Sequence, residues 1–240
     1  MCHVPNILLN RLGQAELNRL QPNLKRVRLT QGQVLHPAQR PITHVYFPET
    51  GMVSMLTVMT TGEQIETSII GNEGIVGGWV ALDNSDSNTQ STVQIDGSAW
   101  EMPTAKYVEN YNASKVLRDA VNKYEGIIRF QAHQSAACQA LHSVEARFCR
   151  WLLISQDVLG SDQVPLTQEF LSHMLGVRRT SVSLVAHSLQ EAGFIQYSRG
   201  KINILTRKAI QEAACECYFV IREKLNSVIN GADRPTQLSS

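Results

Sequence analysis

The sequence predicts an α+β fold: an N-terminal antiparallel β-roll, then one long helix, then a C-terminal winged helix-turn-helix. Three observations lead to this prediction. Short segments rich in β-branched and aromatic residues alternate with turn residues from Leu24 to Met102. A long stretch from Ser114 to Leu141 then contains no proline and one glycine. Finally, residues 165–205 combine two helical apolar patterns, a glycine between them and a hairpin.

Length and composition narrow the class of protein. The 240 residues, 43% hydrophobic and 18% charged, allow one large domain or two modest ones. No apolar run reaches the roughly 18 residues of a membrane span, and the N-terminus lacks the charged and apolar regions of a secretory signal. The five cysteines are odd in number and scattered, which is typical of reduced thiols. We therefore expect a cytoplasmic protein.

The net charge of +1 is a sum of unlike segments. Residues 1–112 carry 7 basic and 10 acidic side chains, and residues 113–160 carry 6 and 4. Residues 161–210 carry 6 and 3, and the last thirty residues carry 3 and 4. An acidic N-terminal half and a basic C-terminal segment indicate contact of the latter with nucleic acid, although a basic excess of this size also occurs on ordinary solvated surfaces.

The N-terminal half begins with an apolar pattern that predicts a helix from Asn6 to Leu20. Strands are expected next, separated by turns at residues 31–32, 49–51, 61–62, 71–72 and 96–97, with Thr61-Gly62 as a hairpin. The carboxylates Glu63, Glu66 and Glu73 are expected on the surface of these strands and turns. The expected strands are Lys25–Leu29, His44–Phe47, Met52–Met59, Gln64–Ile70, Ser91–Ile95 and Ser98–Met102.

Two helices are expected between the roll and the C-terminal domain. Pro103 is suited to the first turn of a helix that reaches Tyr111. In the long helix after it, apolar residues recur every three or four positions and the stripe then becomes polar, which is the spacing of a coiled-coil seam. The seam consists of Leu117, Val121, Tyr124, Ile128, Gln131, Ser135, Cys138 and His142. It covers either the chain's own sheet or the same helix of a second copy; the length of the helix favours a parallel homodimer.

The C-terminal pattern predicts a helix-turn-helix. Ser143 is the expected N-cap of a helix from Val144 to Val158, and Thr167 of a shorter one that ends at Gly176. A second short helix follows and ends near Gly193; its buried stripe is formed by Val182, Val185, Ala186 and Leu189. A glycine turn between two helices sets the second across the first and exposes its N-terminal turns.

The exposed face of that second helix carries the candidate DNA-binding residues. Arg178 and Arg179 lie in a first turn where the helix dipole disfavours cations, so they indicate an external anion or a guanine edge. The hairpin at residues 195–205 has a basic tip with Arg199 and Lys201, which is suited to binding flanking phosphates. The predicted set is Thr167, Arg178, Arg179, Thr180, Ser183, Arg199 and Lys201.

With these residues the chain resembles the Crp/Fnr family of bacterial transcription regulators. The resemblance covers nearly the whole chain and is most specific in Thr167-Gln168-Glu169 and in residues 175–182, LGVRRTSV. It implies that Arg179 reads bases, while Thr180 and Leu184 stand where the family usually has glutamate and a second arginine. It also implies a cyclic-nucleotide-binding-like roll, a homodimer on a pseudo-palindromic site in double-stranded DNA, and RNA polymerase as a partner.

The same resemblance argues against cyclic AMP as the effector. Residues 71–78, GNEGIVGG, match the family's glycine-containing turn, but Gly78 stands where cyclic-nucleotide binders have a ribose-binding glutamate. No Lys or Arg occurs between Arg40 and Lys106, so the phosphate-binding arginine is missing as well. A half-buried phosphate without a charge-assisted donor costs several kcal/mol. The effector, if there is one, is unknown.

No cofactor is expected from the cysteines and histidines. An iron–sulfur cluster needs about four thiolates, and the N-terminal region offers only Cys2. Cys215 and Cys217 lack the spacing of a zinc knuckle, and Cys138 is expected to act as a small buried hydrophobe, although a thiol on the seam also allows a redox role. We therefore predict no metal ligand. Haem ligation remains an alternative, with Cys2, His3, His36 and His44 as the candidates.

The predicted organisation is a sensor domain at residues 1–112, a dimerisation helix at 113–142, a DNA-binding domain at 143–230 and a disordered tail at 231–240. The alternative function is a ligand- or protein-binding module without specific DNA readout. That module would associate with DNA weakly and independently of salt. An enzyme is not expected, because the sequence shows no nucleophile elbow, metal cluster or phosphate loop.

Overall fold

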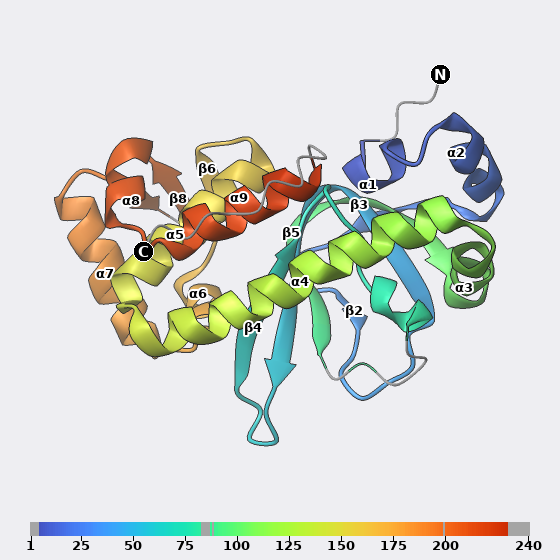
Figure 1. Ribbon diagram of the computed structural model, residues 1–240. Coiled ribbons are helices and arrows are strands. Elements are labelled where there is room, and N and C mark those ends of the chain that lie inside the picture. Colours follow the sequence, from blue (N-terminus) through green and yellow to red (C-terminus); the bar gives the residue numbers. More distant parts are fainter. Residues whose placement is uncertain (1–4, 83–86, 88, 199, 230–240) are drawn as a thin grey trace, which may run out of the picture.

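A computed structural model describes residues 5–82, 87, 89–198 and 200–229. A β-roll and a helical C-terminal domain lie at opposite ends of the long helix α4 (Figure 1). The helices are α1 Ile7–Asn10, α2 Gln14–Leu20, α3 Thr104–Ala113, α4 Lys115–Leu141, α5 Val144–Leu159, α6 Gln168–Leu175, α7 Arg179–Glu191, α8 Arg207–Ala213 and α9 Cys217–Ile229, with 3-10 turns η1 Gln21–Asn23 and η2 Gly78–Ala81. The strands are β1 Lys25–Leu29, β2 Val34–His36, β3 His44–Val58, β4 Gln64–Ile70, β5 Gln90–Pro103, β6 Gln163–Pro165, β7 Ile195–Ser198 and β8 Lys201–Ile204.

The β-roll is an antiparallel sheet in the order β1-β5-β3-β4, with β2 also paired to β5. The sequence predicts a turn at residues 49–51 and another at 96–97, each between two separate strands. Both predictions are wrong, because β3 continues through residues 49–51 and β5 continues through residues 96–97. The register shifts near Gly51, whose φ is +82°, and a Cβ there would lie 2.6 Å from the carbonyl oxygen of Ile95. The glycines thus form bulges that bend two long strands instead of reversing the chain.

A predicted hairpin and a predicted helix of the N-terminal half have different outcomes. The Thr61-Gly62 hairpin is confirmed: Gly62 has φ +89° and its amide donates to the carbonyl of Met59 at 2.9 Å. The single N-terminal helix predicted for residues 6–20 is instead two short helices, because Gly13 has φ +82° between them. Leu8, Leu9, Leu12 and Leu20 from this segment are buried in the core of the roll.

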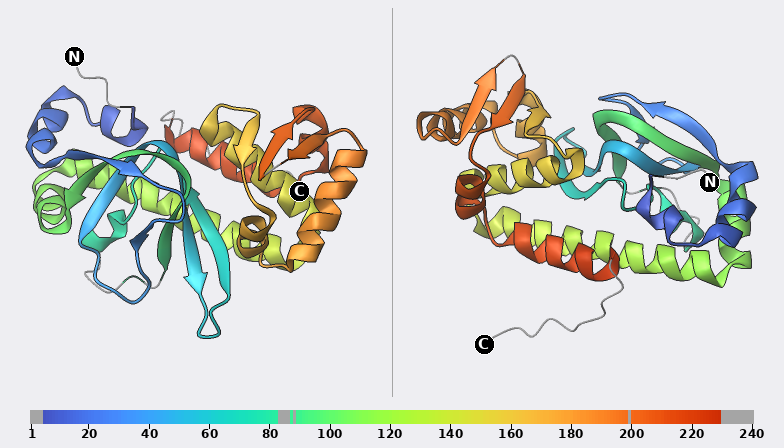
Figure 2. Two further views of the ribbon diagram at one scale, coloured as in Figure 1. Left: turned by 180° about the vertical axis from the view of Figure 1, so that it is seen from behind. Right: turned by 90° about the horizontal axis from the view of Figure 1, so that it is seen from above.

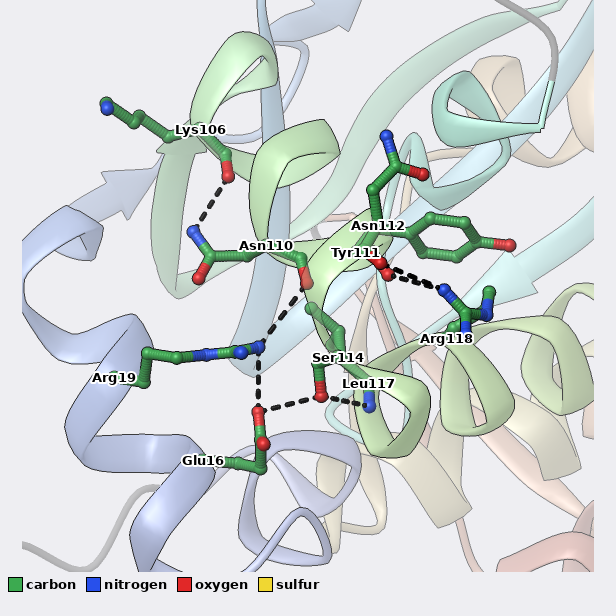
Figure 3. Close-up of polar contacts among 9 residues, drawn as sticks. All are labelled: Glu16, Arg19, Lys106, Asn110, Tyr111, Asn112, Ser114, Leu117 and Arg118. Atoms are coloured by element: carbon green, nitrogen blue, oxygen red, sulfur yellow. Dashed lines mark hydrogen bonds and ion pairs between the residues drawn. The ribbon is translucent and has the colours of Figure 1, made fainter.

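The start of α4 is fixed by contacts with α2 and α3 (Figure 3). Ser114 is the N-cap: its hydroxyl oxygen accepts from the amide of Leu117 at 3.1 Å and its proton is donated to Glu16 Oε2 at 2.9 Å. Arg19 pairs with Glu16 at 2.9 Å and donates to the carbonyl of Asn110 at 3.3 Å. These contacts with α2 and α3 fix the first turn of α4, and the helix then runs along the roll.

The predicted seam of α4 is buried within the chain itself. Leu117, Val121 and Tyr124 are at most 3% exposed and belong to the core of the roll. Gln131 explains why the seam turns polar, since its side-chain amide accepts from the amide of Ile69 at 3.1 Å and donates to the carbonyl of the same residue at 3.3 Å. The seam therefore cannot be the contact with a second copy, and that part of the prediction is wrong.

The C-terminal helix α9 also packs along α4, and the two helices lie side by side in both views (Figure 2). Leu225 and Val228 of α9 pack against the core of the roll. Arg11 Nη1 also donates to the carbonyl of Val228 at 2.7 Å, which links the end of α9 to the segment between α1 and α2. The chain thus returns from the C-terminal domain to the sensor end of the molecule.

A second core joins the roll to the C-terminal domain. Leu56 and Ile69 from β3 and β4 pack in one cluster with Trp151 and Met174 from α5 and α6. Glu66 lies in the same region and is only 6% exposed, so its predicted position on the surface is wrong; Trp151 Nε1 donates to its Oε1 at 3.0 Å. Alternation along β4 turns this side chain toward α5, a partner that the strand pattern alone does not reveal.

No helix within the described residues is long and apolar enough to cross a membrane.

Candidate nucleic-acid interface

The helix-turn-helix is built from α6 and α7 around a glycine. Thr167 is the N-cap of α6, its Oγ1 accepting from the amide of Phe170 at 3.2 Å, as predicted. Gly176 has φ +60° and ends α6, and the amide of Val177 then donates to the carbonyl of Ser172 at 3.0 Å. This pattern is a Schellman-type C-cap, which only a left-handed residue permits without strain. The turn therefore sets α7 across α6.

Two side chains hold the helices in this arrangement. Arg147 of α5 donates through Nη1 to the carbonyl of Leu175 at 2.9 Å, which satisfies a free carbonyl at the end of α6. The Ser183 hydroxyl lies 2.7 Å from Gln168 Oε1 on α6. Ser183 is half-buried, so this predicted DNA-contacting residue is engaged within the domain. The sequence did not indicate either contact, because the partners lie 28 and 15 residues apart.

The outward face of α7 carries both arginines. Arg178 is the N-cap residue, and no side chain caps the helix there. Arg178, Arg179 and Thr180 are all exposed. The first amides of α7 and two guanidinium groups thus point into solvent at the positive end of a helix dipole. An anion at this position would relieve the repulsion between dipole and cations.

Leu184 is an exposed large apolar residue on α7 that lies outside the predicted DNA-binding set. Its side chain is 72% exposed, one turn after Thr180, whereas Val182, Ala186 and Leu189 are buried. The signal was present in the sequence, since Leu184 lies outside the buried stripe of the helix. An apolar side chain in this position is suited to contact the methyl group of thymine.

The wing lies beside the start of α6. Strands β7 and β8 pair antiparallel and β6 pairs with β8, so that Lys201 lies opposite Ser198 and Pro165. Lys201 is exposed. A Cβ on Gly200 would lie 3.5 Å from Thr167 Cγ2, so the tip of the wing approaches the N-cap of α6. Thr167 and Lys201 are therefore neighbours, and Arg199 lies outside the described residues.

The glycine turn of the β-roll is packed against α4. A Cβ on Gly78 would lie 2.7 Å from Glu125 Oε1 and 2.8 Å from Ile75 Cγ2, and Tyr107 donates to the Gly78 carbonyl at 2.8 Å. Burial raises the pKa of Glu125 to about 7. This position has no room for a glutamate side chain in place of Gly78, and the nearest acid is one that would repel a phosphate when ionised.

Of the candidate haem ligands, His36 has a structural role. His36 is 2% exposed; its Nε2 lies 2.7 Å from the carbonyl of His44 and its Nδ1 lies 3.2 Å from Ser91 Oγ. Both ring nitrogens are therefore occupied by the roll itself. Cys2 and His3 lie outside the described residues, as does the predicted tail at 231–240.

The comparisons with known proteins fit this arrangement. Residues 146–213 match the model of the Crp-like helix-turn-helix domain. No curated protein matches the chain. The chain is similar in structure to a transcriptional regulator assigned to the Crp/Fnr family from Eubacterium rectale, at 18% identity and a TM-score of 0.69, over 86% of this chain and 96% of that one.

Two further solved structures share the fold. FixK2 from Bradyrhizobium japonicum is 14% identical with a TM-score of 0.67, over 80% of this chain and 98% of that one. The c-di-GMP-responsive global regulator CLP from Xanthomonas campestris is 14% identical with a TM-score of 0.65, over 79% and 98%. The chain therefore has the β-roll, long helix and helix-turn-helix of this group, which consists of transcription regulators and not of enzymes.

Proposed function

We propose that this chain, which carries a Crp-like helix-turn-helix domain and has the fold of the Crp/Fnr transcription regulators, is a cytoplasmic, homodimeric regulator. It binds a pseudo-palindromic operator in double-stranded DNA and is not controlled by cyclic AMP. The observation that carries the proposal is the uncapped N-terminus of α7, where Arg178 and Arg179 are exposed beside the wing.

The residues divide between base and phosphate contacts. Arg179, in the first turn of α7, reaches into the major groove and reads a base, and Arg178 and Thr180 contact bases or the backbone. Thr167, Arg199 and Lys201 bind phosphates from the wing side. Ser183 positions α7 through Gln168, and Leu184 contacts a thymine methyl, which adds a sequence preference that an arginine there would not give.

The dimer uses the face of α4 that is opposite the buried seam. Gly126 has open space beyond its Cα, Ala137 is exposed, and Leu141 is 79% exposed. With Phe130 and His133 these residues recur at spacings of three and four on one face of the helix. A groove of about 400 Å³ between α4 and α9, lined by Gly126, Phe130 and His133, could accept side chains from a partner helix.

The β-roll lacks both the positive charge and the free space that binding of cyclic AMP would require. The roll carries no Lys or Arg from residue 41 to 105, and Glu125 with Ile75 closes the position beside Gly78. The regulator CLP is described as responsive to c-di-GMP, so a shared fold does not require cyclic AMP. RNA polymerase is the partner that we expect for a regulator of this type.

The salt dependence of binding tests this function against the alternative of a module without DNA readout. Duplexes selected by the protein from a random pool should converge on two half-sites about one helical turn apart. Binding to them should weaken linearly in log K against log salt, with a slope of about −0.9 for each phosphate contact. A pool that does not converge, or binding that is insensitive to salt, would favour the module.

A further inference from the structure

Four metal-ligand side chains meet where α4, α5 and α9 come together. Cys138 lies in the last turn of α4, His142 is its C-cap, and Cys215 and Cys217 lie before and at the start of α9. One ligand atom from each, Sγ or a ring nitrogen, lies within 4.8 Å of all the others. The two pairs are 77 and 75 residues apart in sequence, so the short spacing of Cys215 and Cys217 gave no indication of the cluster.

The distances fit one tetrahedral ion. With bonds of about 2.3 Å to sulfur and about 2.05 Å to nitrogen, the edges of a tetrahedron are about 3.8 Å between two sulfurs and about 3.6 Å between sulfur and nitrogen. Cys138 Sγ lies 3.5 Å from Cys215 Sγ, and Cys217 Sγ lies 3.5 Å from His142 Nδ1. A cluster of two or more irons would divide the ligands between metals and spread them further apart.

Neighbouring groups are arranged as partners of metal ligands. His142 Nδ1 is turned to the cluster, and its Nε2 lies 3.0 Å from Glu216 Oε2, which is the carboxylate–histidine arrangement that orients a ligating imidazole. Gln134 Nε2 donates to Cys217 Sγ at 3.1 Å. Each of these bonds would hold a ligand in place and stabilise the negative charge of a thiolate.

Two buried arginines can compensate the negative charge of a thiolate site. Arg147 and Arg150 are 6% and 5% exposed, and the Nε atom of each is buried without a hydrogen-bond partner. Arg150 interacts electrostatically with Cys138 and with Cys215, so its positive charge faces the cluster. Three thiolates, a neutral imidazole and a divalent cation sum to one negative charge, which the guanidinium groups offset in this poorly solvated region.

We propose that Cys138, His142, Cys215 and Cys217 bind one Zn²⁺ per chain, each thiol releasing its proton to solvent on binding. Thiolate and imidazole ligands in a closed, four-coordinate set are typical of structural zinc. The ion fastens the junction of α4 and α5 to the connection between α8 and α9. It thereby fixes the C-terminal domain on the long helix, and Arg147 extends the contact to the end of α6.

The test uses the full-length protein, expressed with zinc and purified under reducing conditions without chelator. Mass spectrometry of the native protein and elemental analysis should find one zinc per chain. Replacement by Co²⁺ should give the thiolate charge-transfer and visible d–d bands of a tetrahedral site. Protein without metal, with stoichiometric iron and sulfide, or with a Cys138–Cys215 disulfide would overturn the proposal.

The variants have a matched control in Cys149, a buried cysteine of α5 that is not part of the cluster. Cys217→Ser and Cys138→Ser should lose stoichiometric zinc, whereas Cys149→Ser should retain it. Glu216→Gln leaves all four ligands in place and should weaken zinc affinity by about 10- to 100-fold, measured by competition with a chelating dye. Equal zinc loss from Cys149→Ser, or unchanged affinity in Glu216→Gln, would contradict the site as described.

We also expect bound zinc to strengthen DNA binding. This expectation rests on the proposed function, so it is measured separately from the zinc content of the protein. Removal of zinc should raise hydrogen exchange at residues 138–142 and 215–217 and weaken operator binding at least about tenfold. If the exchange rises but operator affinity is unchanged, the coupling is refuted. If the protein holds zinc yet selects no operator, the function is refuted and the site remains.

Discussion

Single residues couple the β-roll to the helix-turn-helix. Glu66 on β4 accepts from Trp151 Nε1 of α5 at 3.0 Å and from the hydroxyl of Ser54 on β3. Gln94 Nε2 of β5 lies 3.3 Å from Met174 Sδ of α6. A carboxyl group that is 6% exposed is favoured in its neutral form, and burial raises the pKa of Glu66 to about 7.

The raised pKa predicts how stability changes with pH. Glu66 has an ordinary pKa of 4.5, so the folded state holds this proton more tightly than the unfolded state between pH 4.5 and 7. The contribution of the Glu66 carboxyl to the free energy of unfolding is therefore complete below pH 4.5. It is lost as the pH rises through 7, and the loss amounts to at most roughly 3 kcal/mol. Relative to wild type, Glu66→Gln should therefore be more stable at pH 8 than at pH 5.

Urea unfolding at a series of pH values measures this difference. Glu63→Gln, at an exposed position near the hairpin, is the control and should follow the wild-type profile. Glu125 has a pKa raised by burial to about 7, so some pH dependence remains in Glu66→Gln. Parallel profiles for Glu66→Gln and wild type would refute the role of Glu66.

The residues that could be predicted from sequence are those whose role is local. Ser143 and Thr167 are N-caps in the structure as predicted, because a cap depends on the three residues that follow it. The predicted surface position of Glu66 was wrong, and the prediction for Cys138 did not include the side chains around it. In both cases the contacting residue lies far away in sequence, 85 positions for Glu66 and 77 for Cys138. Local patterns contain no information about such partners.

At the scale of elements, α4 is another case in which the sequence predicts local structure but not a distant partner. Its length and start were predicted correctly, but the partner of its apolar seam was not. The roll and α9 together cover that seam, and α9 carries no pattern that identifies α4 as its neighbour. The surface that we propose for contact with a second copy is therefore the opposite face of α4, where Phe130 lies between Gly126 and Ala137.

This assignment predicts that Phe130→Glu disrupts the dimer. A charge at the centre of an apolar helix contact has no partner when it is buried, so association should weaken. Sedimentation or light scattering should find monomer, and operator affinity should fall roughly 100-fold because both half-sites are no longer bound together. Val34→Glu, which places the same charge on an exposed apolar residue of β2, is the control and should remain dimeric.

An unchanged dimer in Phe130→Glu would place the interface on another surface of the molecule.

At the scale of the whole molecule, the chain folds back on itself. One core fills the roll, a second joins the roll to α5, α6 and α7, and α9 returns along α4 to the N-terminal helices (Figure 1). The predicted order of roll, long helix and helix-turn-helix is the observed one, because each part has its own local pattern. The docking of the parts was not predicted, since it depends on residues from all of them.

This arrangement leaves the proposed DNA-binding surface of α7 exposed. The core contacts use the buried stripe of α7, and Arg178, Arg179 and Thr180 point away from both cores. Arg179 has no role within the described cores, so its replacement should leave fold and dimer intact. The central claim, that α7 reads DNA, therefore depends most directly on this residue.

The decisive measurement is a footprint of wild type and Arg179→Ala on the selected operator, with Lys208→Ala of α8, an exposed lysine outside the proposed interface, as the matched control. We predict that Arg179→Ala remains a folded dimer but no longer protects the operator, a loss of about 1–3 kcal/mol in discrimination per half-site, while Lys208→Ala protects it normally. An unchanged footprint with Arg179→Ala would contradict the assignment of α7 as the recognition helix.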